Sequence, residues 1–241
     1  MDKIKLGVLV GGTSIEREVS KKSCENLLAN LDENKSEITV YHLPADGNTE
    51  WAKNIISNPP QIVLSALHGG NGENGSIQGF LHCLNIPYIG SKVLSSAICM
   101  NKAMAKTVMK ANHIQVPDHV FVMRGVDFSQ YEESIKLMGF PLIVKPNRGG
   151  SSIGVIVARN MEDIHYGIKN IIETYDDDVL IEKFIDGKEI NCCVLQGENG
   201  PEAMAVLDVK KAGSVFVYDD KYHIDEYSSD ITSLPDFMQD M

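Results

Sequence analysis

The stretch of the sequence best suited to chemistry is KPNRGGSSIGV, residues 145–155. Lys145 ends an apolar run, and Arg148 stands just before two glycines and two serines. Small residues expose backbone N–H groups, and these donors, two hydroxyls and two nearby cations suit phosphate oxygens. A glycine hairpin between two strands explains the same letters, so the stretch alone favours neither interpretation. It is not a Walker A loop, because the G-K-[S/T] ending is missing.

A second glycine-rich stretch, HGGNGENG (68–75), contains the pattern G-x-G-x-x-G at Gly70, Gly72 and Gly75. It lies between a strand pattern and a helix pattern, as in dinucleotide-binding turns. The spacer is long and polar, however, and no acidic residue ends the next predicted strand to hold a ribose. We therefore assign no dinucleotide site here. His68, at the start of the stretch, either faces a ligand or caps the turn.

Other charged residues have ordinary explanations when each is taken alone. Lys102, Lys145 and Lys183 would be surface lysines, and Glu182 and Glu189 would be solvated carboxylates. Glu16 falls in the first turn of a predicted helix, where the helix dipole favours an acid. Only the combination of these residues can point to a function.

The elements that must position these residues differ between the two halves of the chain. The first half alternates strand and helix patterns, which predicts a parallel sheet covered on both faces. Its predicted strands are 4–10, 37–43, 61–67 and 87–90, and its predicted helices are 14–31, 48–57 and 76–84.

The second half has the pattern of a mostly antiparallel α+β fold. Its predicted helices are 101–114, 127–139 and 161–175, and its predicted strands are 118–123, 140–146, 151–158, 178–185, 188–196 and 202–209. We therefore divide the chain near residue 95. Residues 217–241 are rich in acids and poor in apolar residues, and no strand is predicted there.

Composition excludes several classes of function. The formal charge of −11 argues against general nucleic-acid binding, which needs a basic face, although a local basic pocket could still hold an anion. No apolar run approaches the ~20 residues of a membrane span, and the N-terminus lacks a signal sequence. The five cysteines form no C-x-x-C pair, which favours free thiols in a reducing cytoplasm and no metal role.

Seven motifs in order resemble those of the D-alanine–D-alanine ligases, members of the ATP-grasp superfamily. They extend over nearly the whole chain: GGTSIEREVS (11–20), LHGGNGENGSIQG (67–79), PYIGS (87–91), MNKAMAK (100–106), KPNRGGSSIGV (145–155), VLIEKFIDGKEI (179–190) and VYDDKY (217–222).

The resemblance implies an α/β N-terminal parallel-sheet domain followed by an α+β ATP-grasp domain that is incomplete at its C-terminus. The expected divisions are a pre-ATP-grasp domain at 1–95, a first ATP-grasp subdomain at 96–179 and the start of a second subdomain at 180–241. A homodimer is also usual in the family.

The implied activity is the ATP-dependent joining of two D-alanines through a D-alanyl phosphate, for peptidoglycan precursors in cell wall biogenesis. The resemblance implies that Lys102 and Lys145 neutralise ATP phosphates under the loop 149–152. Glu182 and Lys183 would contact adenine, and Glu189 the ribose. The full set expected to bind ATP is Lys102, Lys145, Gly149, Gly150, Ser151, Ser152, Glu182, Lys183, Phe184, Ile185 and Glu189.

The resemblance also assigns the amino-acid substrates. Glu16 would pair with the ammonium of the first D-alanine, beside His68, and Tyr218 and Lys221 would complete that site. Glu16, Ser151 and Tyr222 would form a hydrogen-bonded catalytic set that holds a mobile loop, 214–225, closed. Tyr222 favours an amine as second substrate, because relatives that make the D-lactate ester tend to carry phenylalanine there.

The sequence departs from the family pattern where the metal should bind. The family places R-x-D, E-x-N and P-G-(M/L)-T segments after the last motif, and their carboxylates and amide bind two Mg²⁺ ions. None of these segments follows VYDDKY in the sequence, so Mg²⁺ is expected for the family but no metal ligand is assigned. Two hypotheses follow: a ligase whose active form needs a further segment, or a non-catalytic remnant that binds nucleotide or amino acid.

Overall fold

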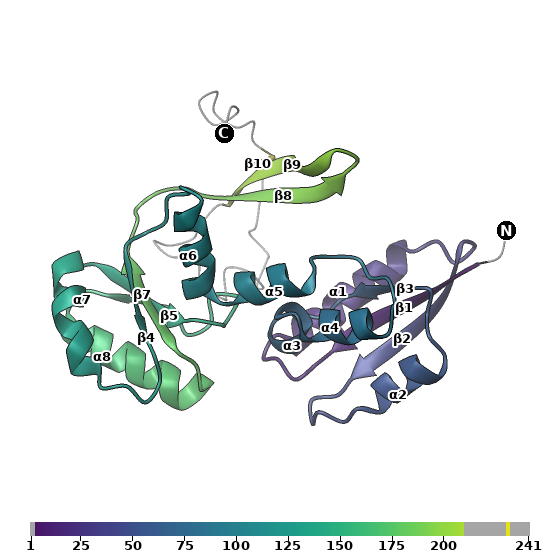
Figure 1. The fold of residues 1–241 in the computed structure, drawn as a ribbon, viewed down its shortest axis with the longest axis horizontal. Coiled ribbons are helices and arrows are strands. Elements are labelled where there is room, and N and C mark those ends of the chain that lie inside the picture. The colour runs from purple at the N-terminus through teal and green to yellow at the C-terminus, as the bar shows by residue number, and fades with distance from the viewer. Residues whose placement is uncertain (1–2, 210–229, 232–241) are drawn as a thin grey trace.

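The computed structural model describes residues 3–209 and 230–231, and its N-terminal part is built on a parallel sheet (Figure 1). The strands are β1 (Ile4–Gly11), β2 (Ser36–Leu43) and β3 (Ile62–Ser65), in the order β2-β1-β3. The predicted strand at 87–90 is reduced to a single parallel bridge between Tyr88 and Val63. The parallel sheet predicted for this half is confirmed.

Helices cover both faces of this sheet. Leu6, Val8 and Val10 pack against α1 (Arg17–Asn30) on one face. Leu9 and Val63 pack against α2 (Glu50–Ser57) and α4 (Ser76–Cys83) on the other. The glycine-rich stretch before α4 folds into the one-turn helix α3 (Gly70–Glu73), which sequence patterns did not predict.

Two helices lead into the second part of the chain. They are α5 (Val93–Met100), which was not predicted, and α6 (Lys102–Ala111). The division placed near residue 95 therefore falls inside α5. The Asn101 side chain caps α6 by accepting a hydrogen bond from the N–H of Met104.

The second part contains an antiparallel sheet of four strands in the order β4-β7-β5-β6. These are β4 (His119–Val122), β5 (Leu142–Pro146), β6 (Ile156–Ala158) and β7 (Val179–Lys183). α7 (Glu132–Met138) and α8 (Met161–Asn170) pack against it. A 3-10 turn at Phe128–Tyr131 precedes α7, and a π-helical turn at Ile171–Tyr175 follows α8. The α+β fold predicted for this half is confirmed.

Alternation along β5 and β7 gives this sheet one apolar and one polar face. Val144 and Ile181 are paired in register and lie in the core with α7 and α8. Lys145 and Glu182 each follow one of these residues, so their side chains point to the opposite face. That face carries the candidate site.

The strand predicted at 151–158 is largely wrong. Only Ile156–Ala158 forms β6, and residues 151–154 form a turn. Ser151 and Ser152 have φ angles of 50° and 57°, in the left-handed region that a strand cannot accommodate. KPNRGGSSIGV is therefore a loop and not a simple hairpin of two long strands.

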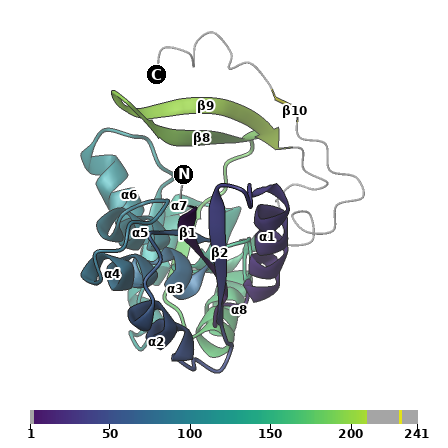
Figure 2. The same cartoon turned by 90° about the vertical axis from the view of Figure 1, so that its right-hand side faces the viewer.

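A ribbon of β8 (Glu189–Gly197) and β9 (Gly200–Val209) extends from the second part and lies along one side of the molecule (Figure 2). Asp230–Ile231 forms β10, which pairs antiparallel with β9. The prediction of no strand in 217–241 was therefore wrong at Asp230–Ile231. A strand of only two residues leaves no alternating apolar pattern by which the sequence could reveal it. Across the described ranges, no helix combines the length and apolar character that crossing a membrane requires.

Candidate ATP and amino-acid site

A cavity of about 400 Å³ opens on the polar face of the four-stranded sheet. It is lined by every residue that the resemblance assigned to ATP, from Lys102 on α6 to Glu189 on β8. The remaining lining residues are mainly apolar: Pro117, Ile143, Pro146, Ile153 and Val155. An apolar cleft with a few converging charges is the usual form of a site for a small molecule. The role of each lining residue remains a prediction.

Three charged side chains from three elements meet beside this cavity. Glu182 on β7 pairs with Lys145 on β5 through Oε1, and its Oε2 lies 2.9 Å from Nζ of Lys106 on α6. Burial raises the pKa of the Glu182 carboxyl, but the two lysines more than offset this effect and hold the pKa below its usual value. Glu182 is therefore ionised at neutral pH.

Lys102 is held by the backbone of the loop. Its Nζ donates to the carbonyl oxygens of Pro146, at 3.0 Å, and Asn147, at 3.4 Å, and also to that of Gly149. Burial, together with the charge of Lys145, lowers the pKa of Lys102 to about 8. All three protons of the ammonium are thus engaged by the loop that the resemblance places over phosphate.

Lys183 differs from the other lysines of the site. It faces the same side of the sheet as Leu142, its partner in register, which is the side that α7 covers. Its Nζ donates to the carbonyl oxygens of Met138 and Gly139 at 3.0 and 2.9 Å. Lys183 lines the cavity, but its charge anchors the C-terminal end of α7.

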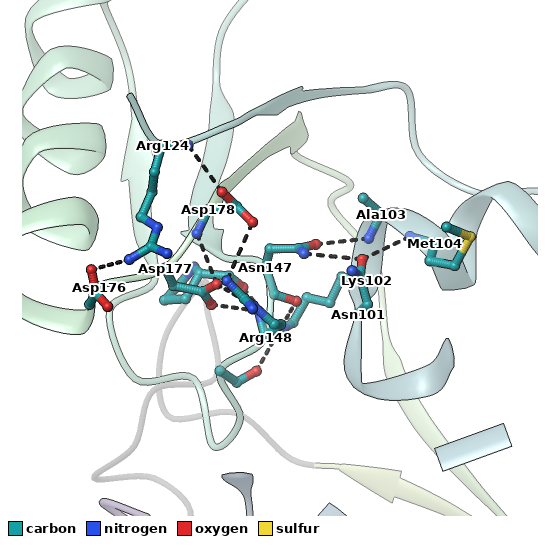
Figure 3. A network of polar contacts seen from close by, with 12 residues as sticks. Asn101, Lys102, Ala103, Met104, Arg124, Asn147, Arg148, Asp176, Asp177 and Asp178 are labelled. Carbon is teal, nitrogen blue, oxygen red and sulfur yellow. Dashed lines mark hydrogen bonds and ion pairs between the residues drawn. The ribbon is translucent and has the colours of Figure 1, made fainter. Parts of the chain in front are cut away.

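The loop is anchored at its base by a polar network (Figure 3). The fully buried Asn147 accepts from the N–H of Ala103 at 2.9 Å and donates to the Asn101 side chain at 3.0 Å. Asp177 accepts from the backbone N–H and the Nε of Arg148, at 2.6 and 2.8 Å. The network joins α6, the loop and the start of β7, so it fixes Lys102 relative to the strands.

The residues assigned to the first D-alanine lie on the N-terminal part. Glu16 is only 6% exposed and accepts a hydrogen bond from the Ser151 hydroxyl of the loop. His68 lies at a separate cavity of about 150 Å³, with Nε2 2.8 Å from the Ser23 Oγ. Glu16 lines another cavity, of about 490 Å³, and Ser14 borders both. The structure therefore brings Glu16 to the loop but gives His68 a different set of neighbours.

Some predicted residues lie outside the described ranges. They are Tyr218, Lys221 and Tyr222, so their assigned roles remain predictions.

Magnesium does not fit the described part of the site. Between residues 3 and 209, and at 230–231, no group of three or more His, Cys, Asp or Glu side chains could hold a metal ion. Glu182, the carboxylate of the cavity that contacts Lys145, is already paired with Lys145 and Lys106. We therefore derive no step through the metal.

Sequence reasoning missed three residues that organise the site: Lys106, Asn147 and Asp177. Lys106 had a usable signal, because it follows Lys102 by four residues and a helix places both on one side. Asn147 lies inside a recognised motif, where its polar side chain next to a proline could have been expected to anchor the loop. Asp177 gave no signal, since it is one of three consecutive aspartates, and only burial distinguishes it from Asp176.

Comparison with known protein families gives two matches along the chain. The family described as "D-ala D-ala ligase C-terminus" matches residues 108–236, and the one described as "D-ala D-ala ligase N-terminus" matches residues 49–91. Together they include both the loop and the glycine-rich stretch before α4.

Individual relatives agree. A D-alanine–D-alanine ligase of Bacillus anthracis is 37% identical over 233 residues, which are 96% of this chain and 73% of the relative. The crystal structure of the Bacillus anthracis ligase complexed with ATP aligns with a TM-score of 0.76 at 31% identity, covering 96% of this chain and 72% of that one. The VanG D-Ala:D-Ser ligase of Enterococcus faecalis aligns with a TM-score of 0.76 at 26% identity, covering 95% and 76% of the two chains. By these matches and its fold, the chain belongs to the D-alanine–D-alanine ligase family of ATP-grasp proteins.

Proposed function

We propose that the chain is an ATP-dependent ligase of the cytoplasm that joins two D-alanines through a D-alanyl phosphate, for peptidoglycan precursor synthesis. The observation that carries the proposal is the cavity on the polar sheet face. It gathers Lys102 and Lys145 under a glycine–serine loop whose Ser151 contacts Glu16 of the N-terminal part. A nucleotide site and a site for a cationic amine are thus joined by one loop.

In the proposed reaction, a carboxylate oxygen of the first D-alanine attacks the γ-phosphorus of ATP, and ADP leaves. The amine of the second D-alanine then attacks the carbonyl carbon of this acyl phosphate, loses a proton and displaces phosphate. Lys102 and Lys145 would offset the negative charge on the transferring phosphoryl group. The loop would exclude water, which would otherwise hydrolyse the acyl phosphate.

Binding of ATP must change the contacts of Lys102. Its ammonium has three protons, and each faces a carbonyl oxygen of the loop. To reach a phosphate oxygen, Lys102 must release at least one of these carbonyls. Nucleotide binding and loop movement are therefore coupled in this proposal.

A second candidate function is binding of nucleotide or amino acid without turnover. It is favoured by one observation: the Glu182 carboxylate in the cavity is already paired with Lys145 and Lys106, whereas phosphoryl transfer relies on carboxylates that hold a metal ion. The ligase must bind both ATP and D-alanine and release phosphate, whereas the second candidate binds at least one of the two without release.

The deciding experiment measures D-alanine-dependent phosphate release from magnesium ATP by the purified chain. Release that requires D-alanine, is not supported by L-alanine and is lost in Lys145→Met would support the ligase. Binding of ATP or D-alanine without release would support the second candidate, and a chain that binds neither would refute both. Light scattering on the same sample would test the homodimer expected from the family.

A further inference from the structure

Glu182 carries an ion pair on each oxygen of its carboxylate. Oε1 pairs with Nζ of Lys145, and Oε2 lies 2.9 Å from Nζ of Lys106. The side chains are 10% exposed for Glu182, 19% for Lys145 and 13% for Lys106. Water and salt screen such buried charges much less than surface charges, so losing one partner strengthens the hold of Glu182 on the other.

The three residues are not equivalent with respect to the cavity. Lys145 and Glu182 line it, whereas Lys106 is not among its lining residues. Lys106 reaches Glu182 from α6, one helical turn after Lys102. Lys106 therefore acts on a ligand in the cavity without touching it, through its charge and through its pairing with Glu182.

We propose that Lys106 is a positioning residue for nucleotide phosphate: by pairing with Glu182 it weakens the hold of that carboxylate on Lys145 and leaves Lys145 able to bind phosphate. The inference rests on the proposed function, because it takes ATP as the ligand. With Lys106 present, the trio of Lys106, Lys145 and Glu182 carries one net positive charge. Without it, Lys145 and Glu182 neutralise each other, and the cavity loses half of the net positive charge that the trio and Lys102 provide.

The same arrangement explains why Glu182 is tolerated beside an anionic ligand. Glu182 is expected to contact adenine, and its carboxylate would also repel the phosphates of the same ligand unless its charge is satisfied elsewhere. Two lysines hold the pKa of Glu182 below its usual value against the effect of burial. Removing Lys106 removes one of these lysines, so the pKa of Glu182 should rise in the chain without nucleotide.

The test uses three variants of the full chain. Lys106→Met removes the charge, Lys106→Arg keeps it, and Lys110→Met removes one charge from an exposed position on the same helix. The first measurement is an NMR titration of the Glu182 side-chain carboxyl without nucleotide. The second is calorimetric binding of ATP, ADP and adenosine to each variant.

We expect Lys106→Met to raise the Glu182 pKa, to weaken ATP and ADP binding by roughly tenfold or more and to change adenosine binding by no more than about twofold. Lys106→Arg should restore most of the ATP affinity, and Lys110→Met should resemble wild type. Equal losses for adenosine and ATP would overturn the proposal, since they indicate a general structural defect. An unchanged Glu182 pKa in Lys106→Met would also overturn it.

The two proposals fail in different ways. A wild-type chain that binds no nucleotide would refute the proposed function and, with it, the role of Lys106 in phosphate binding. A wild-type chain that binds ATP with full affinity, matched by Lys106→Met, would refute only the positioning role.

Discussion

Ser151 and Glu16 lie 135 residues apart in the chain, and the Ser151 hydroxyl donates a hydrogen bond to Oε1 of Glu16. Ser151 belongs to the loop that lines the cavity on the polar face of the four-stranded sheet, and Glu16 directly precedes α1 in the N-terminal part. Glu16 is almost fully buried, so the bond forms away from bulk water, where it is stronger than at a surface. The loop is therefore tied to the part of the molecule that would hold the amino acid.

Ser151→Ala should loosen the loop without unfolding the protein. A hydrogen bond to a charged group contributes about 1.5–3 kcal/mol, so amide exchange at residues 149–153 should accelerate roughly tenfold or more. Exchange in β5 and β7 should be unchanged. Ser152→Ala is the matched control, because the neighbouring serine has a similar φ angle, 57° against 50°. Equal acceleration in both variants would argue against the Ser151–Glu16 bond as the tie.

Gly69→Ala tests a second contact of the Glu16 carboxylate, which lies against Gly69 as well as against the Ser151 hydroxyl. Gly69 has a φ of +64°, and an added Cβ would overlap the Oε2 of Glu16 and the Oγ of Ser14. Backbone strain and displacement of Glu16 should together lower the free energy of unfolding by about 1–3 kcal/mol and accelerate exchange in the loop. Urea denaturation and hydrogen exchange measure the two effects.

Gly79→Ala provides the control for the same type of substitution. Gly79 lies inside α4, and nothing within 4 Å would meet an added Cβ. Alanine is the better helix former by roughly 1 kcal/mol, so this variant should be slightly more stable than wild type. A neutral Gly69→Ala would contradict the account of Glu16. A Gly79→Ala variant destabilised as much as Gly69→Ala would show that the loss does not come specifically from the contact with Glu16.

The fold was largely predictable because its hydrophobic patterns are regular. Alternation of short apolar runs and helical patterns predicts the parallel sheet β2-β1-β3 and its helices, and the confirmed elements lie within a few residues of their predicted ends. The errors occur where local conformation overrides pattern. Ser151 and Ser152 adopt left-handed φ angles, so a strand-like sequence begins as a turn. α5 was missed because its small and apolar residues show no polar face.

The site was predictable as a set of motifs but not as a network. No single lysine or carboxylate in the sequence separates a site residue from a surface residue, and the resemblance supplied that distinction. The resemblance could not identify the hydrogen-bond and ion-pair partners of these residues. The carbonyl contacts of Lys102 and the sharing of Glu182 by two lysines depend on how α6 packs on the sheet, and the contact of Lys183 with α7 depends on how α7 packs there.

Asp177 and Asp176 test how burial decides the value of an ion pair. Asp177 is 9% exposed and accepts two hydrogen bonds from Arg148, whereas Asp176 is 89% exposed and pairs with Arg124 at the surface. Asp177→Asn should lower the free energy of unfolding by about 1–3 kcal/mol, and Asp176→Asn by less than ~0.5 kcal/mol. Asparagine keeps the shape and tolerates the left-handed φ of residue 176. Similar losses of unfolding free energy in the two variants, measured by urea denaturation, would show that burial does not strengthen the interactions of Asp177.

Lys102 should make stability depend on pH in an alkaline window. Its pKa is about 8 in the folded chain against an ordinary value of 10.5, because burial disfavours the ammonium. Between these two pH values the unfolded chain binds more protons than the folded chain. The contribution of Lys102 to the free energy of unfolding should therefore rise with pH through this window, by about 3 kcal/mol in total, and be constant below pH 7.

Other groups titrate in the same range, so the measured quantity is the difference in unfolding free energy between wild type and Lys102→Met at each pH. That difference should grow in favour of wild type from about pH 8 to 10, and Lys110→Met is measured in parallel as the control for loss of an exposed lysine on the same helix. A Lys102→Met difference that does not change with pH would mean that the loop carbonyls stabilise the ammonium enough to cancel the effect of burial.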